Sequence, residues 1–379
     1  MSWNTHAINI LARHVRILKA LLKIIRFLPA VILMGTGLCL VYVGTIASEY
    51  GSAHGKMMVG NRQEMVDRLK AGGEELPFSF AVIGDTNGTE TGEQLLSAAE
   101  SEGDIRFVVN LGDVVSEPDI WQHRYFQTES REYMRGDMPM FLVAGNHDIR
   151  EDPAKAHLPR ERVVRNKEYD EMYGTRKFSF VYSRCLFIIS DFDDSGEKYI
   201  DYIERVLREK RGECEHAFVF LHVPPVQLRG TADTRVTPRK DELFRILKEY
   251  SVDTAFFGDF HGYWRGKVND VSVAVTGGGG SRLQGDTAYG FHHLLVITVD
   301  KNGTSERIIS IPTAHDLDDK VEKLCFTMVF PALGASPAMY YAVGAAVLLA
   351  GAAIAFKMIR ARLRRKAAWR PPLAARTEP

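Results

Sequence analysis

The sequence predicts an α/β fold with one transmembrane helix at each end, and three observations support this fold class. Five short apolar runs between residues 80 and 257 are typical of buried strands. Helical patterns lie between several of these runs, as they do in βαβ units. Two apolar runs without a charge, 27–47 and 337–356, lie outside this region, and about 20 such residues span a membrane as a helix.

Each of the five apolar runs leads into an Asp, Asn or His. The runs are 80–83, 107–111, 140–144, 217–221 and 254–257, and the residues that follow them are Gly84-Asp85-Thr86-Asn87, Gly112-Asp113, Gly145-Asn146-His147-Asp148, His222 and Gly258-Asp259-Phe260-His261. Because α/β proteins bind ligands where their strands end, we expect these residues to form one polar cluster. Carboxylates this close together repel one another unless a cation lies among them. The pattern therefore indicates a metal site.

The order of these motifs resembles that of the calcineurin-like metallophosphoesterases, over about residues 78–312. The family pattern is D-x-H, G-D, G-N-H-[DE], H and G-H-x-H. Asn87 stands where the family usually has His, and Asp259 stands where it has the first His of the last motif. The resemblance implies a metallophosphoesterase-type β-sandwich flanked by helices. It also implies hydrolysis of a phosphomonoester, phosphodiester or pyrophosphate.

The resemblance further implies two divalent metal ions, with Asp113 as the ligand that both share. The other implied ligands are Asp85, His261 and, weakly or in the outer shell, Asn87 for one ion, and Asn146, His222 and Asp259 for the other. Two such ions clamp a phosphoryl group and generate a hydroxide nucleophile at neutral pH. Oxygen donors replace two imidazoles here, which favours Mn or Fe(II), with Mg and Zn also open.

His147 and Asp148 are the candidate catalytic residues. By resemblance, His147 would protonate the leaving oxygen or stabilise developing charge, and Asp148 would orient the His147 ring. Simpler alternatives stay open: Asn87 as a turn residue, Asp259 as a loop cap and Asp148 as a helix cap. The rival function is a non-catalytic binding or receptor domain on the same fold. We favour an enzyme because the remaining ligand positions match the family.

Further elements are expected between and after the motifs. Helices are expected at 95–101, 121–134, 198–210 and 241–250, a hairpin at 178–189, and strands at 271–276 and 294–299. Residues 150–177 are expected to be a loop or cap over the site. No Gly-Lys-Ser/Thr follows Gly277-Gly278-Gly279-Gly280, so a tight turn is favoured over a phosphate loop. Residues 48–77, with a short helix at 61–69, and residues 313–336 are expected to be linkers.

The distribution of charge orients the two apolar runs. Residues 1–26 and 357–370 contain Lys and Arg but no acid, and basic flanks stay in the cytoplasm. We expect an inner (cell) membrane protein with two spans, cytoplasmic termini and an extracytoplasmic catalytic domain. Residues 1–26 would form a basic amphipathic helix on the inner leaflet, and residues 357–379 a basic cytoplasmic tail. A cleaved signal peptide is the alternative for the first run.

The distribution of charged residues limits the classes of binding partner that we expect. Lys plus Arg and Asp plus Glu both number 48, so net charge identifies none. Both basic ends abut apolar runs, so we expect the membrane and not nucleic acid as a partner. An anchored site lies near headgroups, which makes a lipid-linked phosphate ester a candidate substrate, with soluble nucleotides also open. Cys185 and Cys214 begin strands that are neighbours in the implied fold, where they would form a disulfide or remain buried thiols.

Overall fold

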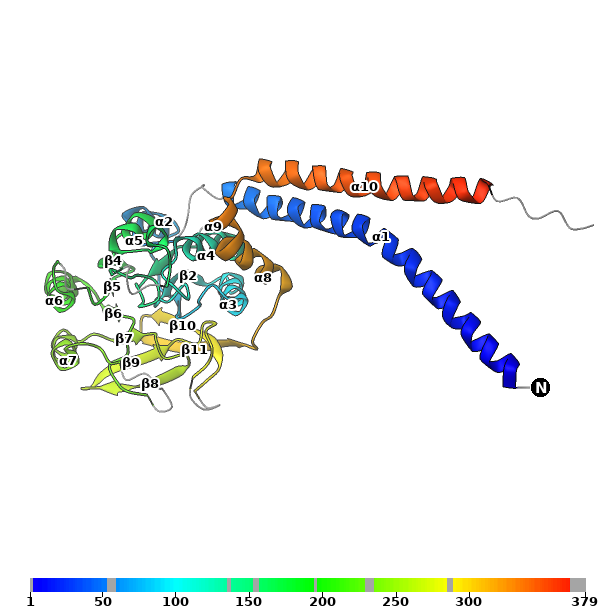
Figure 1. Cartoon of the computed structure of the whole chain (residues 1–379). Helices are drawn as coiled ribbons and strands as arrows, with labels where there is room; N and C mark the ends of the chain where they lie inside the picture. The colour runs from blue at the N-terminus through cyan, green and yellow to red at the C-terminus, as the bar shows by residue number, and fades with distance from the viewer. Residues whose placement is uncertain are drawn as a thin grey trace, which may run out of the picture. The chain divides into compact units, whose positions relative to one another are not determined.

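The computed structural model describes residues 3–52, 59–134, 138–152, 157–193, 196–228, 235–284 and 289–368. The chain divides into two compact units. One consists of Met1–Ser52 and Leu333–Pro379, and the other is Ala53–Ala332. Figure 1 labels the elements of both units.

Two β-sheets form the centre of the larger unit (Figure 1). The five-stranded sheet has the order β11 (Gly303–Ile311), β10 (His292–Asp300), β1 (Phe78–Ile83), β2 (Ile105–Asn110) and β3 (Met140–Leu142). The six-stranded sheet has the order β4 (Phe178–Tyr182), β5 (Cys185–Ile189), β6 (His216–Phe220), β7 (Thr254–Phe257), β9 (Val271–Thr276) and β8 (Tyr263–Val268). The strands β1, β2 and β3 run parallel, as do β5, β6, β7 and β9.

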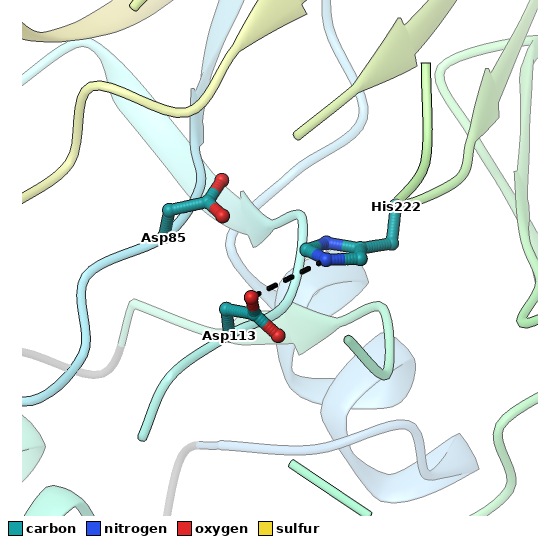
Figure 2. A group of neighbouring side chains, drawn as sticks. All are labelled: Asp85, Asp113 and His222. Atoms are coloured by element: carbon teal, nitrogen blue, oxygen red, sulfur yellow. Dashed lines mark ion pairs between the residues drawn. The ribbon is translucent and has the colours of Figure 1, made fainter. Parts of the chain in front are cut away.

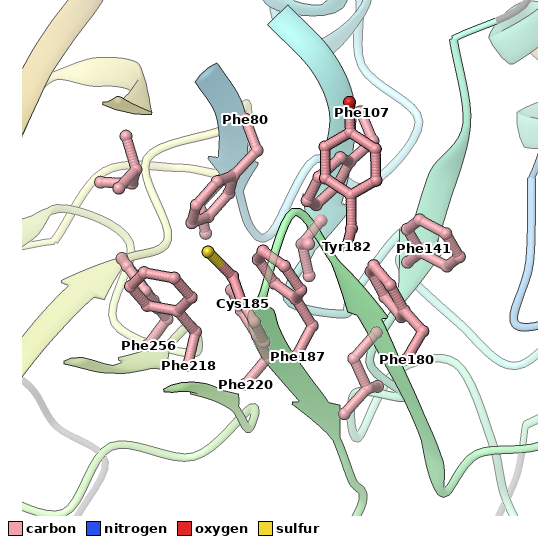
Figure 3. Packing of buried hydrophobic residues seen from close by; sticks show 14 of the residues in the cluster. Phe80, Phe107, Phe141, Phe180, Tyr182, Cys185, Phe187, Phe218, Phe220 and Phe256 are labelled. Carbon is pink, nitrogen blue, oxygen red and sulfur yellow. The ribbon is translucent and has the colours of Figure 1, made fainter. Parts of the chain in front are cut away.

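Aromatic side chains from both sheets fill the space between them (Figure 3). Phe80 of β1 stacks on Phe107 of β2, with ring centroids 5.3 Å apart, and meets Phe187 of β5 edge-on at 5.3 Å. Along β1, Phe78 and Phe80 face this core, whereas Ala81 faces the opposite side. Strands buried on both faces read as continuous apolar runs, which explains why the sequence revealed them.

Helices cover the outer face of each sheet. The helices α3 (Glu90–Ser101), α4 (Ile120–Tyr133) and α5 (Asn166–Tyr173) share an apolar cluster with the outer face of the five-stranded sheet. The helices α6 (Tyr199–Lys210) and α7 (Lys240–Glu249) do the same for the six-stranded sheet. The helix α2 (Gln63–Ala71) adds its apolar side chains to the inner core. The result is a β-sandwich flanked by helices, and this prediction is confirmed.

Residues 313–336 differ from the linker that we expected. They contain α8 (Leu317–Leu324), a π-helical turn (Cys325–Val329) and α9 (Phe330–Leu333). Phe326 and Phe330 are buried, and their rings lie 5.5 and 6.1 Å from those of Tyr125 and Trp121 on α4. The charges of α8 suggested a solvated linker, but the apolar residues that follow, one helical turn apart, dock this segment onto α4.

The smaller unit contains two long helices, α1 (Trp3–Ser52) and α10 (Pro337–Ala368). Within them, Arg26–Tyr50 and Pro337–Arg364 are long and apolar enough to cross a membrane, each with a mean hydropathy of 2.1. A Cβ added to Gly344 would lie 2.9 Å from the carbonyl oxygen of Gly37, so glycines allow the two backbones to approach closely. The side chains of the basic segments 1–25 and 365–379 lie outside the described residues.

The two cysteines of the neighbouring strands are free thiols in this structure. Cys185 begins β5, Cys214 lies just before β6, and both are buried. Burial raises the pKa of Cys185 to about 12. Of the two alternatives that the sequence left open, the structure therefore contains the pair of buried thiols.

Candidate metal centre

The polar residues that follow the strands meet at one edge of the sandwich. Asp85 follows β1, Asp113 follows β2, and His222 follows β6. Each offers a ligand atom, and these atoms all lie within 4.8 Å of one another. Figure 2 shows the three side chains converging, with an ion pair joining Asp113 and His222. All three are buried, so the cluster is built into the domain.

The backbone at these strand ends is unusual. Asp85, Asn87, Asp113 and Asp259 have φ values of 59°, 51°, 53° and 61°. Residues other than glycine rarely adopt this left-handed region, at a cost on the order of 1–3 kcal/mol each. Such strain persists only where the surrounding structure enforces it, and it clusters at functional sites.

Glycines let other segments approach the two carboxylates. A Cβ on Gly145 would lie 2.2 Å from Asp113 Oδ1, and one on Gly277 would lie 2.5 Å from Asp85 Oδ2. Both distances are far below van der Waals contact. Gly277 opens the glycine run after β9, so this run is a close turn beside the cluster, as expected.

Three histidines are oriented in the same manner by backbone carbonyls. The Nδ1 atoms of His222, His261 and His147 lie 2.8, 2.8 and 2.7 Å from the carbonyl oxygens of Leu111, Arg282 and Ser116. A carbonyl oxygen only accepts, so each Nδ1 donates and each Nε2 is left for another partner. This is the arrangement that orients histidine ligands of metals.

Two groups of donor atoms lie around the carboxylates of Asp113 and Asp85. His222 Nε2 lies 3.0 Å from Asn146 Oδ1, 3.4 Å from Asp113 Oδ2 and 3.6 Å from Asp259 Oδ1. Separately, His261 Nε2 lies 3.6 Å from Asp85 Oδ1. The fold therefore brings Asn146, His222 and Asp259 together, and places His261 beside Asp85.

A bound cation would stabilise the buried carboxylates of this cluster. Burial raises the pKa of Asp85 well above its usual value, and its Oδ1 atom has no hydrogen-bond partner among the described residues. Burial alone would lower the pKa of His222, but the carboxylates of Asp113 and Asp259 outweigh it and raise that pKa. An orphaned buried oxygen amid mixed oxygen and imidazole donors fits divalent metal ions.

Asn87 differs from its expected role as a ligand. When its amide is oriented to satisfy its neighbours, it donates to the carbonyl oxygens of Val115 and Asp113 at 3.0 and 3.1 Å. It then accepts from Ser281 Oγ at 2.5 Å. Together with its left-handed φ, these contacts favour the alternative in which Asn87 is a turn residue.

Asp148 does not orient the ring of His147. Its carboxylate instead accepts backbone N–H groups from Asp113 and Val114, both at 2.9 Å, and from Gly145 at 2.8 Å. Burial raises the pKa of Asp148 to about 6. Asp148 therefore ties the turn after β2 to the turn after β3, and Ser116 orients His147.

His147 is the most accessible of the three histidines. Its side chain is 46% exposed, and its Nε2 lies 4.0 Å from Asp113 Oδ2. Its backbone N–H donates to Asp113 Oδ1 at 2.8 Å. The imidazole therefore stands at the solvent side of the shared carboxylate, where a substrate would arrive.

Two positively charged side chains near the site were not identified from the sequence. Arg235 donates to Asp259 Oδ1 at 2.8 Å. Lys323 of α8 donates to the carbonyl oxygens of Asn87 and Gly88, both at 2.9 Å. Both residues lie in charged, polar stretches that contain several Lys or Arg, and no spacing marks these two.

The chain is similar to known phosphoesterases. The calcineurin-like phosphoesterase family model matches residues 78–263. Serine/threonine-protein phosphatase CPPED1 of Bos taurus is 26% identical over 224 residues, which cover 54% of this chain and 68% of that protein. The Homo sapiens protein of the same name is 25% identical over 239 residues, which cover 58% and 70%. Purple acid phosphatase PPD1 of Lupinus luteus has a TM-score of 0.49 at 16% identity, covering 66% of this chain and 56% of that one.

Residues 78–263 of the chain therefore form a calcineurin-like phosphoesterase domain. It is a metal-dependent phosphoesterase, a hydrolase that acts on phosphate esters.

Proposed function

We propose that the protein is a membrane-anchored, dinuclear-metal phosphoesterase that acts outside the cytoplasm. The observation that carries the dinuclear site is the convergence of Asp85, Asp113 and His222 within 4.8 Å, around a buried oxygen of Asp85 that lacks a hydrogen-bond partner among the described residues. Without bound cations, these buried carboxylates would repel one another.

The donor set assigns ligands to both ions. Asp113 would be shared, Asp85 and His261 would complete one set, and the second set is Asn146, His222 and Asp259. When bound, the ions would supply Lewis acidity and a hydroxide nucleophile, with Mn or Fe(II) favoured by the oxygen-rich donors and Mg or Zn also compatible.

His147 would act on the substrate and not on the metals. Its Nδ1–H is held by the carbonyl of Ser116, so Nε2 is the atom that faces the incoming phosphate ester. Protonated at Nε2, His147 would donate that proton to the leaving oxygen. Asp148 would support this step only indirectly, by fixing the turn that carries His147.

Membrane anchoring and orientation are supported by the two apolar helices and the basic residues outside them. Arg26–Tyr50 and Pro337–Arg364 meet the length and hydropathy of a span, and the charges flanking them favour cytoplasmic termini. A catalytic domain between two anchors would be held beside the outer surface of the membrane. Phosphate esters linked to lipids are therefore candidate substrates, together with soluble phosphate esters.

Metal analysis and a substrate panel on the purified full-length chain test this proposal. We expect two metal ions per chain and hydrolysis of at least one of four classes: a lipid phosphate, a nucleotide, a phosphoserine peptide and pyrophosphate. The peptide belongs in the panel because the relatives are named serine/threonine-protein phosphatases. A chain that binds metal but hydrolyses none of these would favour the binding-domain alternative.

A further inference from the structure

An aromatic pocket lies beside the metal centre. It has a volume of about 250 Å³ and is lined by Gln227, Leu228, Phe260, Trp264 and Tyr289. Phe260 lies in the chain between the proposed ligands Asp259 and His261, so the pocket is next to the metal centre. Nothing in the proposed hydrolysis uses this pocket.

A small hollow lies between the aromatic pocket and Asp259 of the metal centre. This hollow has a volume of only about 10 Å³; Asp259 and Arg235 line it, and it shares Gln227, Leu228 and Phe260 with the aromatic pocket. The same Asp259 lies 3.6 Å from His222 of the metal centre. The pocket and the metal centre are therefore adjacent, because Asp259 and Phe260, neighbours in the chain, contribute to both regions.

The indole of Trp264 is held in place by packing. A Cβ added to Gly266 would lie 2.5 Å from the six-membered ring of that indole, so the ring lies directly against the backbone of β8. Phe260 is only 3% exposed, and it belongs to the apolar cluster against which Trp264 and Leu228 pack. This wall is therefore formed before any ligand binds.

The backbone of a second lining residue, Tyr289, is also held in place. The N–H of Tyr263 donates to the carbonyl oxygen of Tyr289 at 2.8 Å. A Cβ on Gly262 would lie 2.6 Å from the same oxygen, so the two segments are in close contact. The residue Tyr289 itself is 44% exposed, which leaves its ring available at the mouth of the pocket.

Size and lining define what the pocket accepts. An apolar cavity of roughly 150 Å³ accommodates benzene, so about 250 Å³ suits one planar ring or a fused pair. Aromatic walls stack favourably on planar rings, and the amide of Gln227 offers one donor and one acceptor. A long acyl chain would exceed this volume.

We infer that this pocket binds a planar ring carried by the substrate next to its phosphate, as in aryl phosphates and nucleotides. The inference rests on the proposed function, because the ring would belong to a substrate whose phosphate is bound at the metals. It narrows the substrate class to ring-bearing phosphate esters.

The test uses the full-length chain loaded with Mn²⁺ and four esters. Phenyl phosphate and adenosine 5′-monophosphate carry rings, glycerol 2-phosphate carries none, and dioctanoyl phosphatidic acid carries only acyl chains. The variants are Trp264→Ala, which removes a wall, and Gly266→Ala, which pushes the indole aside. Tyr133→Ala, at the end of α4, is a matched control that removes a ring far along the chain from the pocket.

We expect both pocket variants to raise KM for at least one ring-bearing ester about tenfold, the equivalent of about 1.4 kcal/mol of lost stacking. Their kcat values, and both constants for glycerol 2-phosphate, should match those of Tyr133→Ala. The ester with the larger change distinguishes an aryl group from a nucleobase. Equal changes for all four esters, no change for either ring ester, or a change for the lipid ester alone would overturn the inference.

Calorimetric binding of phenyl phosphate and adenosine 5′-monophosphate separates this inference from the proposed function. If the wild type hydrolyses none of the four esters but binds a ring-bearing one, and Trp264→Ala weakens that binding, the proposed function fails while the pocket assignment stands. If neither ligand binds and neither is hydrolysed, the pocket assignment is wrong.

Discussion

At the scale of single residues, His147 and Asp148 differ in exposure and in the groups that they contact. His147 is half exposed beside the shared carboxylate, whereas Asp148 is fully buried and bonded to backbone N–H groups. The sequence motif placed both residues together as a catalytic pair. Only the folded chain reveals that the carbonyl of Ser116, distant in sequence, holds the ring of His147.

His147→Ala should slow hydrolysis in a way that depends on the leaving group. Loss of a general acid costs on the order of 10²–10⁴ in rate, and an alkyl alcohol needs the proton more than an acidic phenol does. We therefore expect a large decrease in kcat for an alkyl phosphate, a small one for 4-nitrophenyl phosphate, and unchanged metal content. Loss of metal in this variant would make His147 a ligand, and equal slowing of both esters would assign it to phosphate positioning.

Asp148→Asn should lower the stability of the folded protein. The amide keeps one acceptor but turns an NH₂ group toward backbone N–H donors, and a buried unsatisfied donor costs about 1–3 kcal/mol. We expect a decrease in Tm of several degrees by differential scanning fluorimetry, with reduced metal content because the turn carrying Asp113 loosens. A variant with wild-type Tm and metal content but greatly reduced kcat would restore a direct catalytic role.

At the scale of secondary-structure elements, strands with long apolar runs were predictable, whereas two edge strands with polar residues were not. β1, β2, β6 and β7 are buried along nearly their whole length and lead into the metal-site motifs. The missed strands β8 and β11 lie at sheet edges, and their exposed positions carry polar residues such as Lys267 and Arg307. The motifs predicted most of the site, but Asn87 and Asp148 bond to backbone groups whose positions depend on the complete fold.

The helix α8 adds a buried group of carboxyls that the sequence did not mark. Ligand atoms of Glu93 on α3, Glu129 on α4 and Asp319 on α8 lie within 4.8 Å of one another. Burial and the neighbouring carboxylates Glu93 and Glu322 raise the pKa of Glu129 from 4.5 to about 10. Burial, followed by Asp319, raises the pKa of Glu93 to about 8.

Stability should therefore fall as the pH rises. Between pH 4.5 and about 10, Glu129 keeps its proton in the folded chain but loses it on unfolding, so deprotonation favours the unfolded state. Glu129→Gln has no proton to lose, so its Tm should match the wild type near pH 5 and exceed it at pH 9, by roughly 2–4 °C for each 1 kcal/mol. An identical Tm difference at both pH values would show that Glu129 does not titrate with an elevated pKa.

At the scale of the whole molecule, the proposed topology links the site to a compartment. Reporters that are active only outside the cytoplasm, fused after Gly72 and after Arg370, measure the position of each point. The basic segments predict activity for the first fusion and silence for the second. The opposite pattern would place the phosphoesterase domain in the cytoplasm.

The central claim is that two metal ions share Asp113, and metal stoichiometry in Asp113→Asn tests it most directly. The substitution keeps the shape of the side chain but removes the charge from the carboxylate that lies 3.4 Å from His222 and within 4.8 Å of an oxygen of Asp85. Asp201→Asn, on the exposed face of α6, is the matched control. We expect the control to retain two metal ions and wild-type activity, and Asp113→Asn to retain almost no metal and no measurable hydrolysis. Full metal content with a near-normal rate in Asp113→Asn would contradict the shared-carboxylate site.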